Sequence, residues 1–162
     1  MEEKTAIQDL YPDDVAHCYG CGRLNEHGHR IRSFWDGEET VARFTPEPHH
    51  TAVPGYVYGG LIASLVDCHG TGSAALAAAR AEGVEPGPDT DPEQVPRFVT
   101  ASLEVQYERP TPLGPELEVR GRIVERSDRK VVVRETVRAE GEVTATGRVV
   151  AVRLPEAGDG ES

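Results

Sequence analysis

A glycine pair and a lone carboxylate lie close together in the segment from His49 to Asp67. Gly59 and Gly60 stand directly before an apolar run that predicts a helix. The first N–H groups of a helix have no acceptor within it, and with the helix dipole they suit an anion or a developing oxyanion. Asp67 comes two turns later among small apolar residues, where a carboxylate needs a specific role. The pattern favours chemistry on a carbonyl group; the alternative is an aspartate that only bonds a neighbouring backbone group or arginine.

Gly60 and Asp67 are too far apart along one helix to act on the same carbonyl group. Seven residues at the rise of an α-helix separate them by roughly 10 Å. If both groups serve one reaction, a second copy of the helix must run in the opposite direction beside the first. A two-fold homodimer provides this arrangement. The spacing therefore predicts an active site that is shared between two protomers.

Cys18 and Cys21 form a Cys-x-x-Cys pair, and His27 and His29 follow shortly after. This combination is a candidate zinc site. Structural zinc takes four ligands, however, and this segment supplies only an irregular set. We therefore expect a packed turn here and no metal ion.

Cys68 and His69 directly follow Asp67 and are a second candidate for nucleophilic chemistry. Adjacent residues on a helix point about 100° apart, so these two side chains do not face each other. A Cys-His catalytic pair is therefore not favoured. We expect His69 to be buried and hydrogen-bonded, with a place in the wall of a substrate tunnel as the alternative.

The hydrophobic pattern predicts which elements position these residues. Two short strands are expected at 30–35 and 40–44, and then one long helix from Gly60 to about Ala81. Gly70 and Gly72 interrupt this helix, which suggests that other elements wrap it closely. Period-two alternation then marks four long strands, around 102–107, 117–123, 131–137 and 143–151. The order predicts an α+β fold in which the last four strands form an antiparallel meander with one buried face.

Acidic residues mark two flanking segments and one loop inside the domain in the chain of 162 residues. We expect residues 1–16 to be a flexible acidic segment and residues 155–162 to be a disordered acidic tail. Residues 82–96 are expected to form a solvated acidic loop after the helix. A single domain is then expected over residues 17–154.

The formal net charge of −11 argues against a nucleic-acid-binding protein, which is usually basic. The sequence also shows no signal peptide and no run of about 18 apolar residues that would span a membrane. Three cysteines without a secretory signal favour a reduced, cytoplasmic protein.

Most of the chain, from Cys18 to Leu154, resembles the PaaI-like acyl-CoA thioesterases of the 4-hydroxybenzoyl-CoA thioesterase superfamily. Three motifs carry the resemblance: Gly55-x-x-x-Gly59-Gly60-x-x-x-x-Leu65-x-Asp67, Cys18-x-x-Cys21-Gly22 and Tyr107-x-x-Pro110. The resemblance implies a hotdog fold, in which a curved antiparallel β-sheet wraps one long central helix. It also implies a homodimer with a continuous sheet, possible further pairing into a dimer of dimers, and hydrolysis of an acyl-CoA thioester without metal or cofactor.

The resemblance also assigns roles to individual residues. The Gly59 N–H is expected to polarise the thioester carbonyl, and Asp67 of the partner chain is expected to activate water or to attack directly. Thr100 falls where the family has a hydroxyl group that positions the water. Residues expected to bind or shape the substrate site are Tyr58, Gly60 and His50.

The sequence departs from the family pattern at two positions. The family usually reads His-Gly-Gly, whereas this chain has Tyr58, whose phenol can still donate a hydrogen bond. Ala52 stands where some branches have an amide. We therefore expect a slow enzyme or one tuned to an unusual substrate. The alternatives are a non-catalytic protein that binds acyl-CoA or an acyl-carrier-protein thioester, and another hotdog chemistry such as dehydration.

Residues 120–138 are a basic segment in an acidic chain, with seven bases and three acids. Because CoA carries phosphates, arginine and lysine at a hairpin tip can hold it as charge-assisted pairs. Arg126, Arg129 and Lys130 are the predicted phosphate ligands. A solvated outer face of the sheet explains the same residues equally well.

Overall fold

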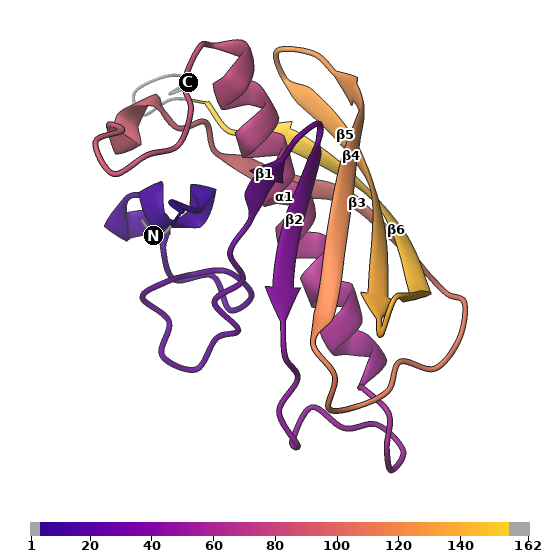
Figure 1. Ribbon diagram of the computed structural model, residues 1–162. Coiled ribbons are helices and arrows are strands. Elements are labelled where there is room, and N and C mark those ends of the chain that lie inside the picture. The colour runs from indigo at the N-terminus through magenta and orange to yellow at the C-terminus, as the bar shows by residue number, and fades with distance from the viewer. Residues whose placement is uncertain (1–3, 156–162) are drawn as a thin grey trace.

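One long helix packs along a curved six-stranded antiparallel sheet in the computed structural model, which describes residues 4–155 (Figure 1). The helix α1 spans Gly59–Ala81. The strands are β1 (Phe34–Asp36), β2 (Glu39–Phe44), β3 (Phe98–Tyr107), β4 (Leu117–Arg126), β5 (Lys130–Ala139) and β6 (Glu142–Arg153). Three short 3-10 helices are η1 (Ile7–Leu10), η2 (Asp13–Val15) and η3 (Pro92–Gln94). The predicted α+β class and hotdog arrangement are confirmed.

The strand order is β1-β2-β4-β5-β6-β3, and it corrects the predicted four-strand meander. β4, β5 and β6 do form a meander, but β3 pairs with β6 and lies at the edge of the sheet. The reason is the connection from β3 to β4. Its residues Thr111 and Leu113 bond the loop before α1, at Val57 and Gly55. The chain therefore crosses the end of the helix between these strands, and no hairpin forms.

The interior of α1 is buried on nearly every side, which explains its small residues. Gly70 lies against Val149 of β6, and a Cβ atom at this position would be 2.6 Å from two carbon atoms of the valine. Gly72 faces the opposite side, where a Cβ atom would crowd Gln8 and Ser33. The helix is long and apolar enough to cross a membrane, but 78% of its most apolar window is buried inside the protein. The expected close wrapping is confirmed.

We expect Gly70→Ala to lower the free energy of unfolding by about 1–2 kcal/mol, because overpacking a core outweighs the gain of about 1 kcal/mol in helix propensity. Val149 is fully buried and has no room to move away. Denaturant unfolding measures the change. In the Val149→Ala background, Gly70→Ala should cost much less. A Gly70→Ala variant as stable as the wild type would contradict this packing.

The N-terminal acidic segment is not the flexible extension that its composition suggested. Ile7 and Leu10 of η1 are buried in a small cluster with Ala75 and Leu76 of α1. Few apolar residues suffice here because the alanine-rich end of the helix offers a flat surface. The predicted disordered tail falls almost entirely outside the described residues.

The acidic loop after α1 is mostly exposed, as expected, but it is anchored at two points. Val95 is buried in the same cluster as Ile7 and Leu10. Glu85 accepts a hydrogen bond from Arg80 at 2.9 Å. The loop therefore helps to cover the C-terminal end of the helix.

A buried polar network joins the N-terminal segment to the helix. His69 is fully buried; its Nδ1 lies 2.8 Å from the Ser33 hydroxyl, and its Nε2 lies 3.0 Å from the Thr40 hydroxyl. Thr40 also bonds Ser73 of α1, and Ser33 accepts from the Gln8 amide. Burial lowers the pKa of His69 to about 4. The prediction that His69 is buried and hydrogen-bonded is confirmed.

Candidate active site

Asp67 and Thr100 come together between α1 and β3. The Thr100 hydroxyl donates a hydrogen bond to a carboxylate oxygen of Asp67, with 2.5 Å between the two oxygens. Asp67 is partly buried on the helix, and Thr100 is exposed on the edge strand. The carboxylate is thus held in one orientation while remaining open to solvent. Two residues that the resemblance implied as partners are in direct contact.

A β-bulge places Thr100 on this face of the sheet. The pairing of β3 with β6 shifts between Thr100 and Ser102. After the bulge, Val105 packs against the core and Tyr107 bonds the start of α1. Strict alternation would put Thr100 on the other face from Val105 and Tyr107, because side chains in a strand alternate. The extra residue turns the hydroxyl towards the helix, as bulges near active sites commonly do.

The start of α1 presents N–H groups to solvent. Gly59 is the first helical residue and Tyr58 is its N-cap, and neither Gly59 nor Gly60 donates its N–H to an acceptor in residues 4–155. The Tyr107 hydroxyl donates to the Gly59 carbonyl at 2.7 Å, which fixes the turn. The exposed Tyr58 ring lies against Gly60, where any Cβ atom would overlap it. This geometry suits an oxyanion donor.

Tyr107 is a site residue that was noted in the sequence only as a strand end in the Tyr107-x-x-Pro110 motif, without a role at the site. Its hydroxyl is the one side-chain group of the described residues that bonds Gly59. Burial, and then the charge of Tyr58, raise the pKa of Tyr107 above its ordinary value. It therefore stays protonated at neutral pH and serves as a hydrogen-bond donor.

A pocket of about 310 Å³ opens beside Asp67. Asp67, Thr100 and Phe98 line one part of it, and Cys18, Cys21 and Cys68 line another. The lining is largely apolar, and its polar side chains include Arg97 and Thr71 as well as Asp67 and Thr100. Such a pocket, apolar with few convergent polar groups, is typical of a site for a small organic ligand.

Asp67 and Gly59 remain apart within one chain. α1 is continuous between them, and eight residues of helix correspond to about 12 Å. The oxyanion donor and the carboxylate of a single chain therefore do not meet at one carbonyl carbon.

His50 lies in the loop before α1, and its contacts are within that region. Its Nδ1 accepts a hydrogen bond from the Glu47 N–H at 2.9 Å, and its carbonyl accepts from the Tyr58 N–H. Its ring packs near Phe44 and His29. Burial, and then the charge of His49, lower the pKa of His50. His50 therefore positions Tyr58 through the backbone, and none of its hydrogen bonds or ring contacts within residues 4–155 involves Asp67 or Thr100.

Arg126, Arg129 and Lys130 lie at the tip of the β4–β5 hairpin and are exposed. Lys130 pairs with Glu125 at 2.9 Å. Arg126 and Arg129 have no carboxylate within salt-bridge distance among the described residues. Two of the three predicted phosphate ligands thus carry uncompensated charge.

The outer face of the sheet carries a second group of arginines. Arg122, Arg134 and Arg148 are direct cross-strand neighbours on β4, β5 and β6. They line a shallow hollow of about 580 Å³ that includes neither Asp67 nor Thr100. The larger hollow is thus separate from the Asp67 carboxylate. We place the candidate active site in the smaller pocket because Asp67 and Thr100 line it.

Glu135 is a buried acid within the basic segment of residues 120–138. It is 3% exposed, and neither carboxyl oxygen has a hydrogen-bond partner in the described chain. The alternation of Val131, Val133 and Val137 was the available signal, because it places residue 135 on the same buried face. Burial, and then the charge of Asp67, raise the pKa of Glu135 well above its ordinary range.

The raised pKa of Glu135 predicts a pH-dependent stability. The folded protein favours the protonated carboxyl. The contribution of Glu135 to the free energy of unfolding is therefore fully present below the unfolded pKa of about 4.5. Stability should decline as the pH rises from there through the folded pKa. Urea unfolding at a series of pH values should show a smaller decline for Glu135→Gln, while the exposed control Glu140→Gln should keep the wild-type slope. Equal slopes in all three proteins would contradict the prediction.

The long helix, the six-stranded antiparallel sheet and the helix carboxylate at a strand hydroxyl define a hotdog-fold protein. A sequence model of the thioesterase superfamily matches residues 54–146. A thioesterase superfamily protein from Shewanella loihica PV-4 is 48% identical, with coverage of 88% of this chain and 98% of that protein and a TM-score of 0.66. The chain belongs to the thioesterase superfamily. A comparison with curated protein sequences finds no match.

Two structures of lower identity share the fold. A thioesterase from Haemophilus influenzae, classed EC 3.1.2.-, is 14% identical, with coverage of 97% of this chain and 96% of its own and a TM-score of 0.68. A Streptococcus mutans UA159 protein bound to acetyl-CoA is 18% identical, with coverage of 78% of this chain and 88% of that protein and a TM-score of 0.57. Family membership supports thioester hydrolysis as the class of reaction.

Proposed function

We propose that this protein hydrolyses an acyl-CoA thioester to a free acid and CoA at a site formed by two protomers. The hydrogen bond between Thr100 and Asp67 is the observation that carries the proposal. It places a carboxylate and a hydroxyl, both open to solvent, in a largely apolar pocket. The acetyl-CoA bound to the Streptococcus mutans protein supports CoA as the carrier of the acyl group.

The reaction needs a nucleophile and a stabilised oxyanion. Asp67 either takes a proton from a water molecule that Thr100 helps to place, or attacks the carbonyl carbon itself. The Gly59 N–H of the partner chain donates to the oxygen that becomes negative as the new C–O bond forms. The C–S bond then breaks, and the sulfur leaves as a thiolate that takes up a proton. In the direct-attack route, water subsequently hydrolyses the acyl-aspartate anhydride.

The edge strand β3 supports a two-fold homodimer. Its outer edge has no pairing partner among residues 4–155 of the same chain, and a long unpaired edge is normally covered. Val99 is 45% exposed, Leu103 39% and Tyr107 53%, although all three are large apolar or aromatic side chains. A second copy paired along β3 would cover them and continue the sheet. It would also supply the Gly59 N–H that Asp67 lacks within its own chain.

Release of free CoA from a panel of acyl-CoAs tests the proposal. Acetyl-, hexanoyl-, palmitoyl-, phenylacetyl- and benzoyl-CoA cover short, long and aryl chains, and chromatographic detection avoids reaction of thiol dyes with the cysteines. Turnover of at least one compound supports hydrolysis and names the acyl class. Tight binding without turnover would overturn hydrolysis of these substrates and favour a binding protein, and formation of an enoyl thioester would favour dehydration.

The hairpin-tip arginine and lysine lead to a prediction about substrate binding. We expect Arg129→Ala combined with Lys130→Ala to raise KM about 10-fold with little change in kcat. The reason is that charge-assisted pairs to phosphate stabilise the bound substrate and the transition state equally. Steady-state kinetics with the best acyl-CoA measures both constants. The matched control is Arg122→Ala with Arg134→Ala, which removes the same charge from the same hairpin. An unchanged KM, or an equal rise in the control, would contradict a specific phosphate site.

A further inference from the structure

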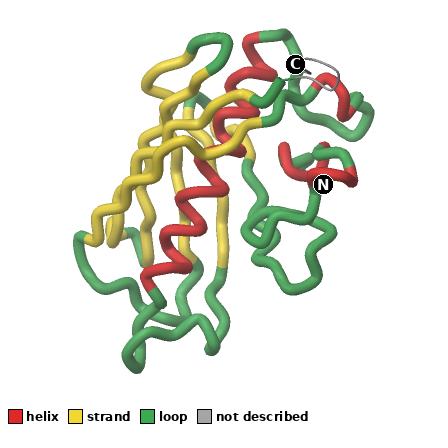
Figure 2. The backbone as a smooth tube through the Cα atoms, turned by 180° about the vertical axis from the view of Figure 1, so that it is seen from behind, coloured by secondary structure: helices red, strands yellow, loops and turns green. Residues whose placement is uncertain are grey.

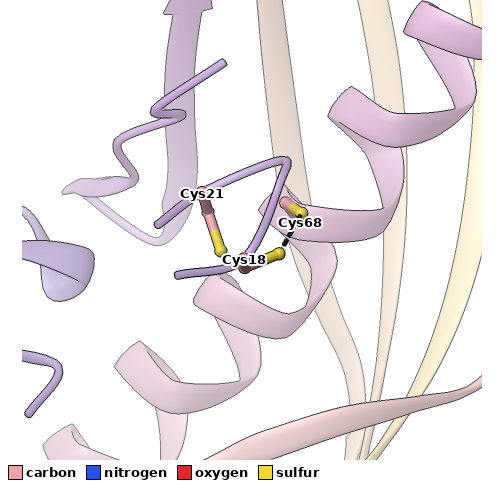
Figure 3. Close-up of side chains that lie close together, drawn as sticks. All are labelled: Cys18, Cys21 and Cys68. Atoms are coloured by element: carbon pink, nitrogen blue, oxygen red, sulfur yellow. Dashed lines mark hydrogen bonds between the residues drawn. The ribbon is translucent and has the colours of Figure 1, made fainter. Parts of the chain in front are cut away.

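The three cysteines of the chain converge on one point beside α1 (Figure 3). Cys18 and Cys21 come from the N-terminal loop, and Cys68 comes from the helix, almost fifty residues later. The sulfur atoms of Cys18 and Cys68 are 3.8 Å apart, and all three sulfurs lie within 4.8 Å of one another. No disulfide links them. His27 and His29, the nearest histidines in the sequence, are not part of this group.

The loop that carries the first two cysteines is shaped to reach the third. The Gly22 N–H bonds the Cys18 carbonyl at 2.7 Å, which closes a tight turn. Gly20 lies directly against the Cys68 sulfur, where any Cβ atom would overlap it. A Cβ atom at Gly22 would overlap the backbone of Cys18 and Ala16. Glycine at both positions therefore lets the turn press its two thiols against the helix.

The distances between the sulfur atoms match those of a thiolate metal site. With Zn–S bonds of about 2.3 Å and tetrahedral angles, two thiolate sulfurs lie about 3.8 Å apart. A disulfide would join two sulfurs at about 2.05 Å and would leave the third without a role. Three sulfurs in one cluster, two of them in a Cys-x-x-Cys turn, follow the ligand spacing of thiolate zinc sites.

The turn directs backbone N–H groups at the Cys18 sulfur. The N–H groups of Cys21 and Gly20 both bond it. N–H groups that converge on a sulfur atom stabilise negative charge there, and the thiolate is the form that binds metal.

We propose that Cys18, Cys21 and Cys68 form a zinc-binding site that fastens the N-terminal loop to the central helix beside the active-site pocket. The described residues offer no fourth cysteine, histidine or carboxylate within the cluster. The fourth position would therefore be taken by water or by a small molecule in the pocket, which these cysteines help to line. The bound ion would hold the loop that forms the wall facing Asp67. This proposal does not depend on the proposed hydrolase activity.

Metal content of the full chain tests the proposal without any measurement of turnover. The protein is produced without a histidine tag, in medium with added zinc, and is purified under reducing conditions. Elemental analysis should find about one zinc per chain. Exchange for Co²⁺ should give sulfur-to-cobalt charge-transfer bands and the strong visible bands of a tetrahedral thiolate site. This spectrum requires no variant, so it stands even if a cysteine variant folds poorly.

Variants then locate the site. Cys21→Ser and Cys68→Ser should each lose the zinc while circular dichroism shows a folded protein. The control, Glu47→Gln with His49→Gln, disrupts the other described group with metal-binding side chains and should keep the full zinc content. Three freely reactive thiols and no zinc after reconstitution would overturn the proposal. So would a Cys18–Cys68 disulfide found by mass spectrometry in place of metal, or zinc retained by both cysteine variants.

Discussion

Asp67→Asn is expected to lower kcat/KM for the best acyl-CoA by about 10²-fold or more, with most of the loss in kcat. Asparagine has nearly the same shape and can still accept the hydrogen bond from Thr100. It cannot take a proton from water or attack a thioester. The variant therefore removes the chemistry of the carboxylate and keeps the packing of the helix. Steady-state release of CoA, with substrate binding measured separately, gives the two constants.

Two controls show whether this loss is specific. Asp89→Asn removes one charge from the exposed acidic loop and should leave kcat unchanged. Thr100→Val removes the hydroxyl that orients Asp67 and should lower kcat by about 10-fold, a smaller loss because the carboxylate remains. If Asp67→Asn kept a rate within a few-fold of the wild type, Asp67 would not be the catalytic group and the proposed mechanism would be wrong.

Gly59→Pro is expected to lower kcat by about 10²–10³-fold, because it deletes the N–H that stabilises the oxyanion. Proline is well tolerated at the first position of a helix, and Tyr58, at φ −58° and ψ 129°, already has the backbone conformation that precedes proline. Gly59→Ala is the matched control, since it keeps the N–H. Its Cβ atom would meet the Tyr107 hydroxyl at 3.4 Å, an ordinary contact. Equal losses in the two variants would point to shape and not to the N–H group.

Gly59→Pro and Asp67→Asn together show whether the site is shared between protomers. A dimer of one Gly59→Pro chain and one Asp67→Asn chain has one site with both defects and one with none. Random mixing of the two inactive proteins should therefore restore about a quarter of the wild-type rate. If both groups of a site came from a single chain, or from no dimer at all, mixing would restore nothing. Refolding the two chains together, with each refolded alone as reference, performs the test.

The class of fold and the main groups of the candidate site could be predicted from the amino-acid sequence. The apolar run after Gly59 and Gly60 and the period-two alternation after residue 97 are local patterns, and they predicted α1 and the long strands. Asp67 stood out because a carboxylate on a small apolar helix face needs a role. The rise of a helix already indicated that Gly60 and Asp67 of one chain do not meet.

Which of these elements and residues come together depends on the three-dimensional packing of the chain. The place of β3 beside β6 follows from the path of residues 108–116 across the helix end, and alternation carries no information about such paths. The bulge between Thr100 and Ser102 turns the hydroxyl towards Asp67, because one extra residue reverses the face of a strand. Cys68 joins Cys18 and Cys21 because a glycine turn lies against the helix. Contacts between distant segments depend on packing in three dimensions, which a pattern along one dimension does not contain.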